Sequence, residues 1–173
     1  MTLAFELDVL CREEGWLQAW PEPQARAEAI AATLFKELLP ELKASVEISL
    51  VLADDAFVQE LNRQYRQKDK PTNVLSFASL DDPLQELRGQ GEGQPLSLGD
   101  VVMALQTVRR EAEEQGKSFD QHASHLLVHG ILHLLGYDHE DEGEALEMES
   151  RETEILAKMA IPDPYAEPAA GHR

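Results

Sequence analysis

The sequence predicts an α/β (α+β) fold in which helices pack against a mixed four-stranded sheet. Strand-like alternation of apolar residues and helical periodicity take turns along the chain. Two predicted strands, over residues 74–77 and 98–104, follow one another with no predicted helix between them, which favours a mixed sheet. A helix over residues 118–135 is rich in leucine on most sides and is expected to be central.

The first part of the chain contains two predicted strands separated by a helix. Apolar and polar residues alternate over residues 3–9, as in a half-buried strand, and again over residues 46–52. Between them, residues 25–38 are rich in alanine and predict a helix. Pro40 closes this helix, because proline lacks the N–H group that a helix interior needs.

The middle of the chain combines a helix, a short strand and a loop. Asp54 or Asp55 is expected to cap a helix that runs to about Arg66. Residues 74–77 are apolar enough to predict the third strand. Residues 81–97 contain two aspartates, two prolines and several glycines, and this composition predicts a loop.

The fourth strand leads into the helix that matters most for function. Residues 98–104 predict this strand, and the helix after it should end near Gly116. Ser118, followed three residues later by Gln121, is a capping-box signature. The next helix should therefore begin there and run to about Leu135.

The end of the chain predicts one more helix and a tail. Residues 142–158 predict a helix with an acidic outer face, whereas residues 161–173 predict a flexible tail. Residues 1–160 are expected to form a single domain, since 173 residues with 43% hydrophobic side chains can bury one core. Cys11, the only cysteine, excludes an internal disulfide and is expected to be buried.

Charge and hydropathy exclude several classes of function. A net charge of -18 opposes generic nucleic-acid binding, which depends on neutralising phosphates. No apolar run reaches the ~18 residues of a membrane helix, and no signal peptide is visible, so we expect a cytoplasmic protein without membrane contacts. Acidic residues dominate residues 138–154. Basic side chains gather at one place: Arg63, Arg66, Lys68 and Lys70. Weak binding to nucleic acid by the protein alone is therefore expected, so a partner would have to deliver any such ligand.

Three histidines have a spacing that predicts an open zinc site. His129 and His133 are four residues apart, about one helical turn, so their imidazoles lie on one face. Gly136 allows the helix to end in a left-handed turn, after which His139 can return to the same point. Three imidazoles without a fourth protein ligand leave a position for water or substrate, and we expect one Zn2+ per chain.

Metzincin proteases share this spacing but carry a glutamate, the general base, directly after the first histidine. Gly130 occupies that position here and cannot transfer a proton. Several alternatives stay open: a metallopeptidase that lacks the usual glutamate, a structural zinc completed by Asp138 or Cys11, and a non-catalytic zinc-containing assembly factor.

The run from His129 to His139, HGILHLLGYDH, resembles the signature of the bacterial YbeY family of metal-dependent endoribonucleases. Two further segments strengthen the resemblance: LNRQYRQKDKPTNVLSF over residues 61–77, and LGD over residues 98–100. The similarity spans about residues 46–165. One departure is Ala78, where the family usually has proline, and only a local backbone effect is expected from it.

The resemblance implies single-strand-specific cleavage of RNA, in maturation of the 3′ end of 16S ribosomal RNA and in ribosome quality control. Ribosomal RNA is the implied substrate, and small-subunit ribosomal proteins or an assembly GTPase are the implied partners. No DNA is expected. Arg66 alone would be interpreted as a cation at the carbonyl end of its helix. The resemblance aligns it with the family's functional arginine and implies a guanidinium that binds phosphate.

Other polar residues near the three histidines receive weaker interpretations. His125, one turn before His129, is expected to support a ligand or to contact RNA. His122 is expected on the helix surface. Asp138 adjoins the third histidine, but no residue is identified as the general base. Solvated positions or diffuse phosphate contacts are expected for the remaining cations, Arg63, Lys68 and Lys70.

Overall fold

The computed structural model describes residues 4–66, 72–90, 95–138 and 141–166. Within these ranges, the strands are β1 Ala4–Cys11, β2 Ser45–Ala53, β3 Val74–Ala78 and β4 Leu96–Ala104. The helices are α1 Gly15–Ala19, α2 Pro23–Leu38, α3 Asp55–Arg66, α4 Pro83–Gln90, α5 Leu105–Gln115, α6 Phe119–Leu134 and α7 Glu142–Lys158.

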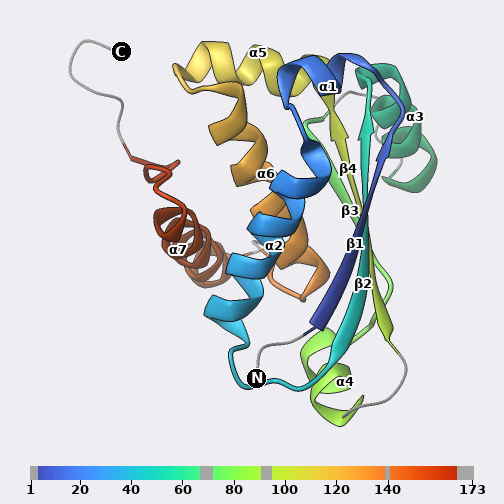
Figure 1. Cartoon of the computed structure of the whole chain (residues 1–173), viewed down its shortest axis with the longest axis vertical. Coiled ribbons are helices and arrows are strands. Elements are labelled where there is room, and N and C mark those ends of the chain that lie inside the picture. Colours follow the sequence, from blue (N-terminus) through green and yellow to red (C-terminus); the bar gives the residue numbers. More distant parts are fainter. Residues whose placement is uncertain (1–3, 67–71, 91–94, 139–140, 167–173) are drawn as a thin grey trace.

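The strands form one mixed sheet in the order β1-β2-β4-β3 (Figure 1). Strands β1, β2 and β4 are parallel to one another, and β3 runs antiparallel to β4 at one edge. The predicted fold class is confirmed. The antiparallel strand β3 lies beside α6, and the candidate site depends on this arrangement.

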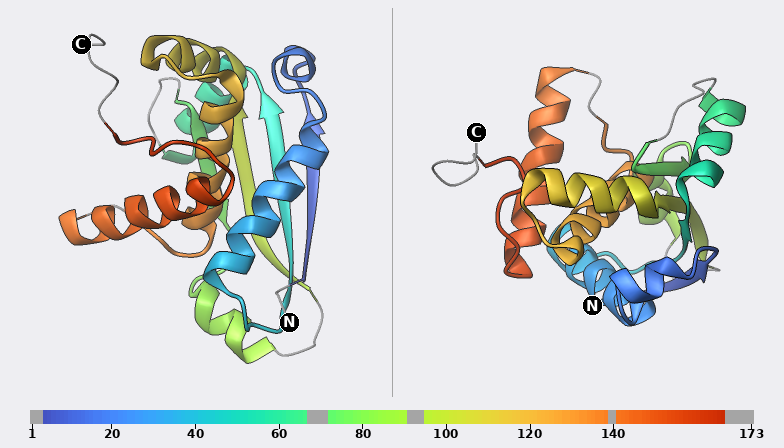
Figure 2. Two further views of the ribbon diagram at one scale, coloured as in Figure 1. Left: turned by 60° about the vertical axis from the view of Figure 1, so that its left-hand side comes forward. Right: turned by 90° about the horizontal axis from the view of Figure 1, so that it is seen from above.

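Helices cover the two faces of the sheet unequally. Helices α2 and α6 pack on one face, with α7 against their outer side, and α3 packs on the other face (Figures 1 and 2). No helix in the described ranges combines the length and the apolar character needed to cross a membrane.

The main core lies between the sheet and the helices α2 and α6. Its largest side chains, including Phe35, Leu50, Leu127 and Ile131, have no exposed surface. A smaller apolar cluster fills the other face, beneath α3. Burial on this scale, at about 25 cal/mol per Å² of apolar surface, holds α6 rigidly on the sheet.

Both ends of α6 follow the prediction. Ser118 Oγ accepts a hydrogen bond from the Gln121 N–H at 3.0 Å, and the Ser118 N–H donates to Gln121 Oε1 at 3.3 Å, which completes the capping box. Gly136 has a φ of 100°, and the N–H of Tyr137 donates to Leu132 O at 3.0 Å. This is the glycine turn that ends a helix and reverses the chain.

The predicted loop over residues 81–97 is wrong for residues 83–90, which form α4. Pro83 begins the helix, where its missing N–H costs nothing, and Leu87 is fully buried. Proline and glycine in the sequence hid this helix. Strands β3 and β4 are neighbours in the sheet, as predicted, although α4 lies between them in the chain.

Two smaller differences concern the N-terminal region. Helix α1 was not predicted, because five residues carry little periodicity. It is held by Trp16, which is fully buried and donates from Nε1 to Ala53 O at 2.8 Å. Cys11, expected to be buried, is exposed at the end of β1.

Candidate active site

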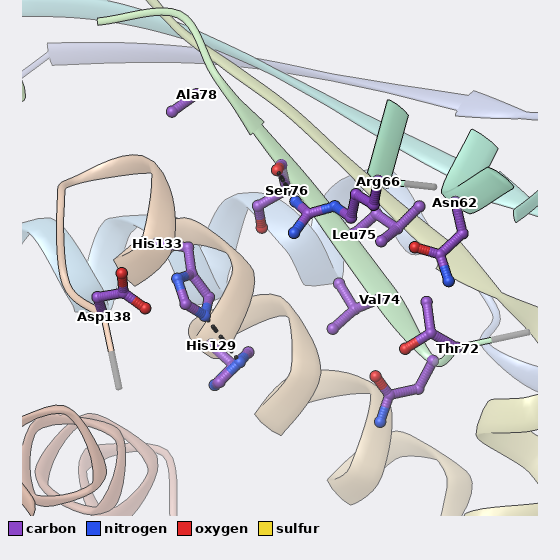
Figure 3. A pocket seen from close by; sticks show the side chains of 11 residues that line it. Asn62, Arg66, Thr72, Val74, Leu75, Ser76, Ala78, His129, His133 and Asp138 are labelled. Atoms are coloured by element: carbon purple, nitrogen blue, oxygen red, sulfur yellow. Dashed lines mark hydrogen bonds between the residues drawn. The ribbon is translucent and has the colours of Figure 1, made fainter. Parts of the chain in front are cut away.

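His129 and His133 lie side by side on α6 with their ring nitrogens turned toward each other. Their Nε2 atoms are 3.1 Å apart, and their rings are nearly perpendicular with centroids 4.6 Å apart (Figure 3). Both side chains are partly exposed and line a cavity of about 520 Å³. The helical spacing thus produces the convergence that the sequence predicted for this pair.

Glu152 of α7 contacts His129 on the side away from the cavity and was not anticipated from the sequence. Glu152 has no exposed surface, and its Oε2 atom lies 2.8 Å from His129 Nδ1. Because an ionised carboxylate only accepts hydrogen bonds, Nδ1 must be the protonated nitrogen of a neutral His129. The Nε2 atom then carries the lone pair, which is directed toward His133 and the cavity.

The same carboxylate collects two further donors. His125 Nε2 lies 2.7 Å from Glu152 Oε1, and the Tyr165 hydroxyl donates to that oxygen at 2.5 Å. Burial alone would raise the pKa of Glu152, but hydrogen bonds from His125, His129 and Tyr165 outweigh it and lower the pKa to about 2. Burial lowers the pKa of His125, and burial with the contact to Glu152 raises that of Tyr165. Glu152 therefore stays an acceptor at neutral pH.

The donor set fits a zinc ion at its first two positions. Two nitrogen ligands of tetrahedral zinc, each at 2.0–2.1 Å, stand about 3.3 Å apart, close to the separation of the two Nε2 atoms here. A carboxylate on the other ring nitrogen is the usual support of a histidine ligand. Among the described residues, no three histidine, cysteine, aspartate or glutamate side chains group to hold a metal. The predicted third ligand, His139, lies outside the described residues, so the three-histidine site stays a prediction.

The cavity lies between α6, α3 and the outer edge of β3 (Figure 3). Asp138 lines it beside His133. Residues from the other two elements make up most of the remaining lining: Asn62 and Arg66 from α3, and Thr72 to Ser76 and Ala78 along β3.

Arg66 is the cation that the structure places in this cavity. Its Nη2 donates to Ser76 O at 2.8 Å, and its guanidinium carbon is 5.8 Å from the centre of the Phe77 ring. The side chain is otherwise exposed, so its remaining N–H groups can reach a ligand. Arg63 instead forms an ion pair with Glu60 on the surface of α3. Two further predicted cations, Lys68 and Lys70, lie outside the described residues.

Gly130 is explained by packing. A Cβ atom built there would lie 2.8 Å from Val101 Cγ1 and 3.3 Å from Ser76 Oγ, and the Ser76 hydroxyl donates to Gly130 O at 3.0 Å. The helix therefore approaches the sheet too closely for any side chain at this position. A glutamate at position 130, as in metzincins, would displace α6 from β4.

His122, expected on the surface, is buried. Its Nε2 lies 2.8 Å from Glu111 Oε1 and its side chain is only 4% exposed. His125 faces Glu152 rather than the cavity, in agreement with the supporting role expected of it and not with an RNA contact. The histidine stripe of α6 thus divides into two buried carboxylate contacts and a pair that faces the cavity.

Ala78 lies where β3 borders the cavity. The neighbouring Ser79 N–H donates to Leu98 O at 3.0 Å, toward β4, so the N–H of Ala78 points away from the sheet. Proline at this position would break no sheet hydrogen bond.

Fold and site define a class: an α+β protein in which paired imidazoles on a buried helix face an arginine across a cavity. The model of the family described as endoribonuclease YbeY matches residues 18–160, and the chain belongs to this family. A protein named endoribonuclease YbeY from Paramagnetospirillum magneticum is 51% identical over 168 residues, covering 96% of this chain and 98% of that protein. Another of that name from Azorhizobium caulinodans is 47% identical, covering 96% and 99%.

A structural relative supports the fold alone. The solution structure of a Thermotoga maritima protein superposes with a TM-score of 0.56 at 22% identity. The match covers 97% of this chain and 100% of that chain. The resemblance that the sequence motifs suggested is confirmed by the family match.

Proposed function

We propose that this chain is a zinc-dependent endoribonuclease that cleaves single-stranded RNA. One observation carries the proposal: the Nε2 atoms of His129 and His133 converge within 3.1 Å in a cavity that also contains Arg66. The family and the names of its relatives agree with an RNA-cleaving hydrolase. Residues 1–160 would act as one hydrolase domain.

His129 and His133, with His139 as third ligand, would hold one zinc per chain. A bound zinc ion supplies Lewis acidity, which makes water a better nucleophile and offsets negative charge at the phosphate. Glu152 would fix His129 in the tautomer with its lone pair on Nε2, and His125 and Tyr165 would keep Glu152 ionised.

Arg66 would bind the phosphodiester that is cleaved. One N–H group of its guanidinium is held by Ser76 O, which fixes the orientation of the plane. The other N–H groups would donate to the non-bridging oxygens, whose charge rises as the phosphorane forms. Arginine suits this role because it stays protonated and presents several donors in a fixed geometry.

Two observations argue against the peptidase alternative. Gly130 supplies no base and has no room for one. In addition, Arg66 occupies Ser76 O on the open edge of β3, where a peptide substrate would need that carbonyl to pair as an added strand.

The proposed biological setting is maturation of the 3′ end of 16S ribosomal RNA and ribosome quality control in the cytoplasm. A net charge of -18 supports delivery of the RNA by a basic partner, such as a small-subunit ribosomal protein, or by an assembly GTPase. Neither DNA nor a membrane is proposed as a partner.

The test incubates zinc-loaded protein separately with single-stranded RNA and with casein, each with and without a chelator. Loss of RNA that the chelator prevents supports the proposal. Loss of casein supports the peptidase. Intact RNA and casein, with ribosomal particles binding the protein, support the non-catalytic assembly factor. A preparation of the Arg66→Ala variant, tested in parallel, controls for contaminating ribonuclease.

A further inference from the structure

Strand β3 has an open edge inside the candidate active site. It is the last strand of the sheet and pairs only with β4 among the described residues. Toward β4, the N–H of Ala104 donates to Asn73 O and the N–H of Ser79 donates to Leu98 O, both at 3.0 Å. Backbone N–H and C=O groups alternate between the two edges of a strand. The N–H and C=O groups of the intervening even-numbered residues therefore point away from β4. These are Val74, Ser76 and Ala78.

Among the described residues, this edge faces the cavity, and its partner from a neighbouring element is Arg66 of α3, which donates to Ser76 O. All three outward residues line the cavity that contains His129 and His133 (Figure 3). Their N–H groups recur every second residue, roughly 6.8 Å apart along the strand. Exposed strand edges are usually short, covered or charged, because they attract other chains. An edge left open within a site is therefore a candidate for ligand binding.

Arg66 decides which ligand suits the edge. Its guanidinium occupies Ser76 O, the central outward carbonyl. An added polypeptide strand needs that acceptor and the Ser76 N–H together, so it is blocked at the middle of the edge. At the middle of the edge, the Ser76 N–H is left as a donor beside a positive charge, whereas Val74 and Ala78 each present a carbonyl as well as a backbone nitrogen outward. Sheet edges with such donors bind anions.

We infer that the open edge of β3 is a binding track for the sugar–phosphate backbone of a single RNA strand. The N–H groups of Val74 and Ser76 would donate to successive phosphates, and the strand would lead the RNA past Arg66 to the imidazole pair. The inference rests on the proposed function and adds a main-chain subsite to it. The edge lies in the cavity between α3 and α6.

Val74→Pro tests the track, because it removes one outward N–H without breaking a sheet hydrogen bond. We expect roughly tenfold weaker binding of a short fluorescein-labelled single-stranded 2′-O-methyl RNA, measured by fluorescence anisotropy. Ala78→Pro, which introduces the residue that the family usually has at this position, should bind like the wild type. Cys11→Pro, on the opposite edge strand β1, is the matched control and should bind like the wild type. Thermal melting of each variant checks that it is folded.

Salt dependence separates a main-chain donor from a charged one. A neutral N–H group releases no counterion, so Val74→Pro should weaken binding equally at every salt concentration. Arg66→Ala should instead flatten the dependence of log affinity on log salt by about 0.7.

Wild-type affinity in Val74→Pro, in protein that cleaves single-stranded RNA, would overturn the track and leave the proposed function standing. No cleavage by the zinc-loaded wild type would remove the proposed function itself. Competition by unfolded casein that Val74→Pro abolishes would assign the edge to polypeptide and overturn the inference.

Discussion

Helix α6 carries two imidazole–carboxylate pairs that are alike in composition and opposite in orientation. His122 meets Glu111 through Nε2, and His129 meets Glu152 through Nδ1, both at 2.8 Å. The His122 side chain is 4% exposed beside a carboxylate that is 26% exposed, whereas His129 is 22% exposed beside a fully buried carboxylate. The His122–Glu111 pair joins α6 to α5, whereas the His129–Glu152 pair adjoins the cavity that His129 lines.

The nitrogen that meets the carboxylate decides what the imidazole can do. Glu111 contacts Nε2 of His122. The other ring nitrogen of His122, Nδ1, is a buried lone pair that has no hydrogen-bond partner among the described residues. Glu152 contacts Nδ1 of His129 and leaves Nε2 facing His133. A histidine beside a carboxylate is thus structural in one orientation and suited to a metal in the other.

The largest contrast is expected in RNA cleavage by His129→Gln and His122→Gln. Glutamine keeps an N–H donor for each carboxylate but replaces a zinc ligand only in the first variant. Cleavage of single-stranded RNA should fall about a thousandfold or more in His129→Gln, since several kcal/mol of transition-state stabilisation depend on the metal. It should stay within a few fold in His122→Gln. Equal losses in initial-rate assays would erase the distinction between the pairs.

Arg66→Ala should reduce the cleavage rate by about 10²–10³, the usual effect of losing one transition-state donor. The matched control is Arg110→Ala, since Arg110 is the arginine next to Glu111 in the chain and acts on its charge. This control should cleave at the wild-type rate, and both variants should keep their zinc. An Arg66→Ala variant as active as the wild type would reduce Arg66 to a helix-end cation.

Glu152→Gln should weaken zinc binding by about 10–100-fold, because an amide holds the His129 tautomer less firmly than a carboxylate. Glu111→Gln should leave zinc affinity unchanged. Competition with a chromophoric chelator measures both variants on one scale. If the two substitutions weaken zinc binding equally, the effect belongs to general stability and not to ligand orientation.

The smallest effect concerns folding stability. Burial would raise the pKa of Glu111, but hydrogen bonds from His122 and Asn73 lower it from its usual 4.5. A lowered pKa contributes stability above the unfolded-state pKa, and this contribution is lost as the pH falls through the folded-state pKa.

Glu111→Gln should therefore be less stable than the wild type by about 1 kcal/mol near neutral pH. The difference should narrow as the pH falls below 4.5. Urea unfolding at several pH values measures it, and a gap that widens on acidification would contradict this sign.

Sequence reasoning predicted the parts of the fold and site that depend on local spacing. The capping box of α6, the glycine turn at Gly136 and the pairing of His129 with His133 each involve residues within a few positions of one another. Helix α4 was missed because its proline and glycine look like loop signals, although Leu87 anchors it by long-range packing.

Glu152 could not be selected from an acidic run by composition alone. A signal was present: it is buried on the same face of α7 as Met148 and Ile155, four residues after one and three before the other. Leu146, although apolar, is 67% exposed, so the buried face of α7 includes Glu152 and not Leu146. The identity of its partners depends on how α7 crosses α6, which no local pattern specifies (Figure 2).

The zinc content of a His129→Gln/His133→Gln double variant, set against His122→Gln, tests the central claim most directly. Each protein is purified, dialysed free of loose metal and analysed for elements, with melting curves to verify folding. The orientation of the two pairs predicts about one zinc per chain in the wild type and in His122→Gln, and none in the double variant. Full zinc in a folded double variant, or equal loss of zinc in a folded His122→Gln, would contradict it.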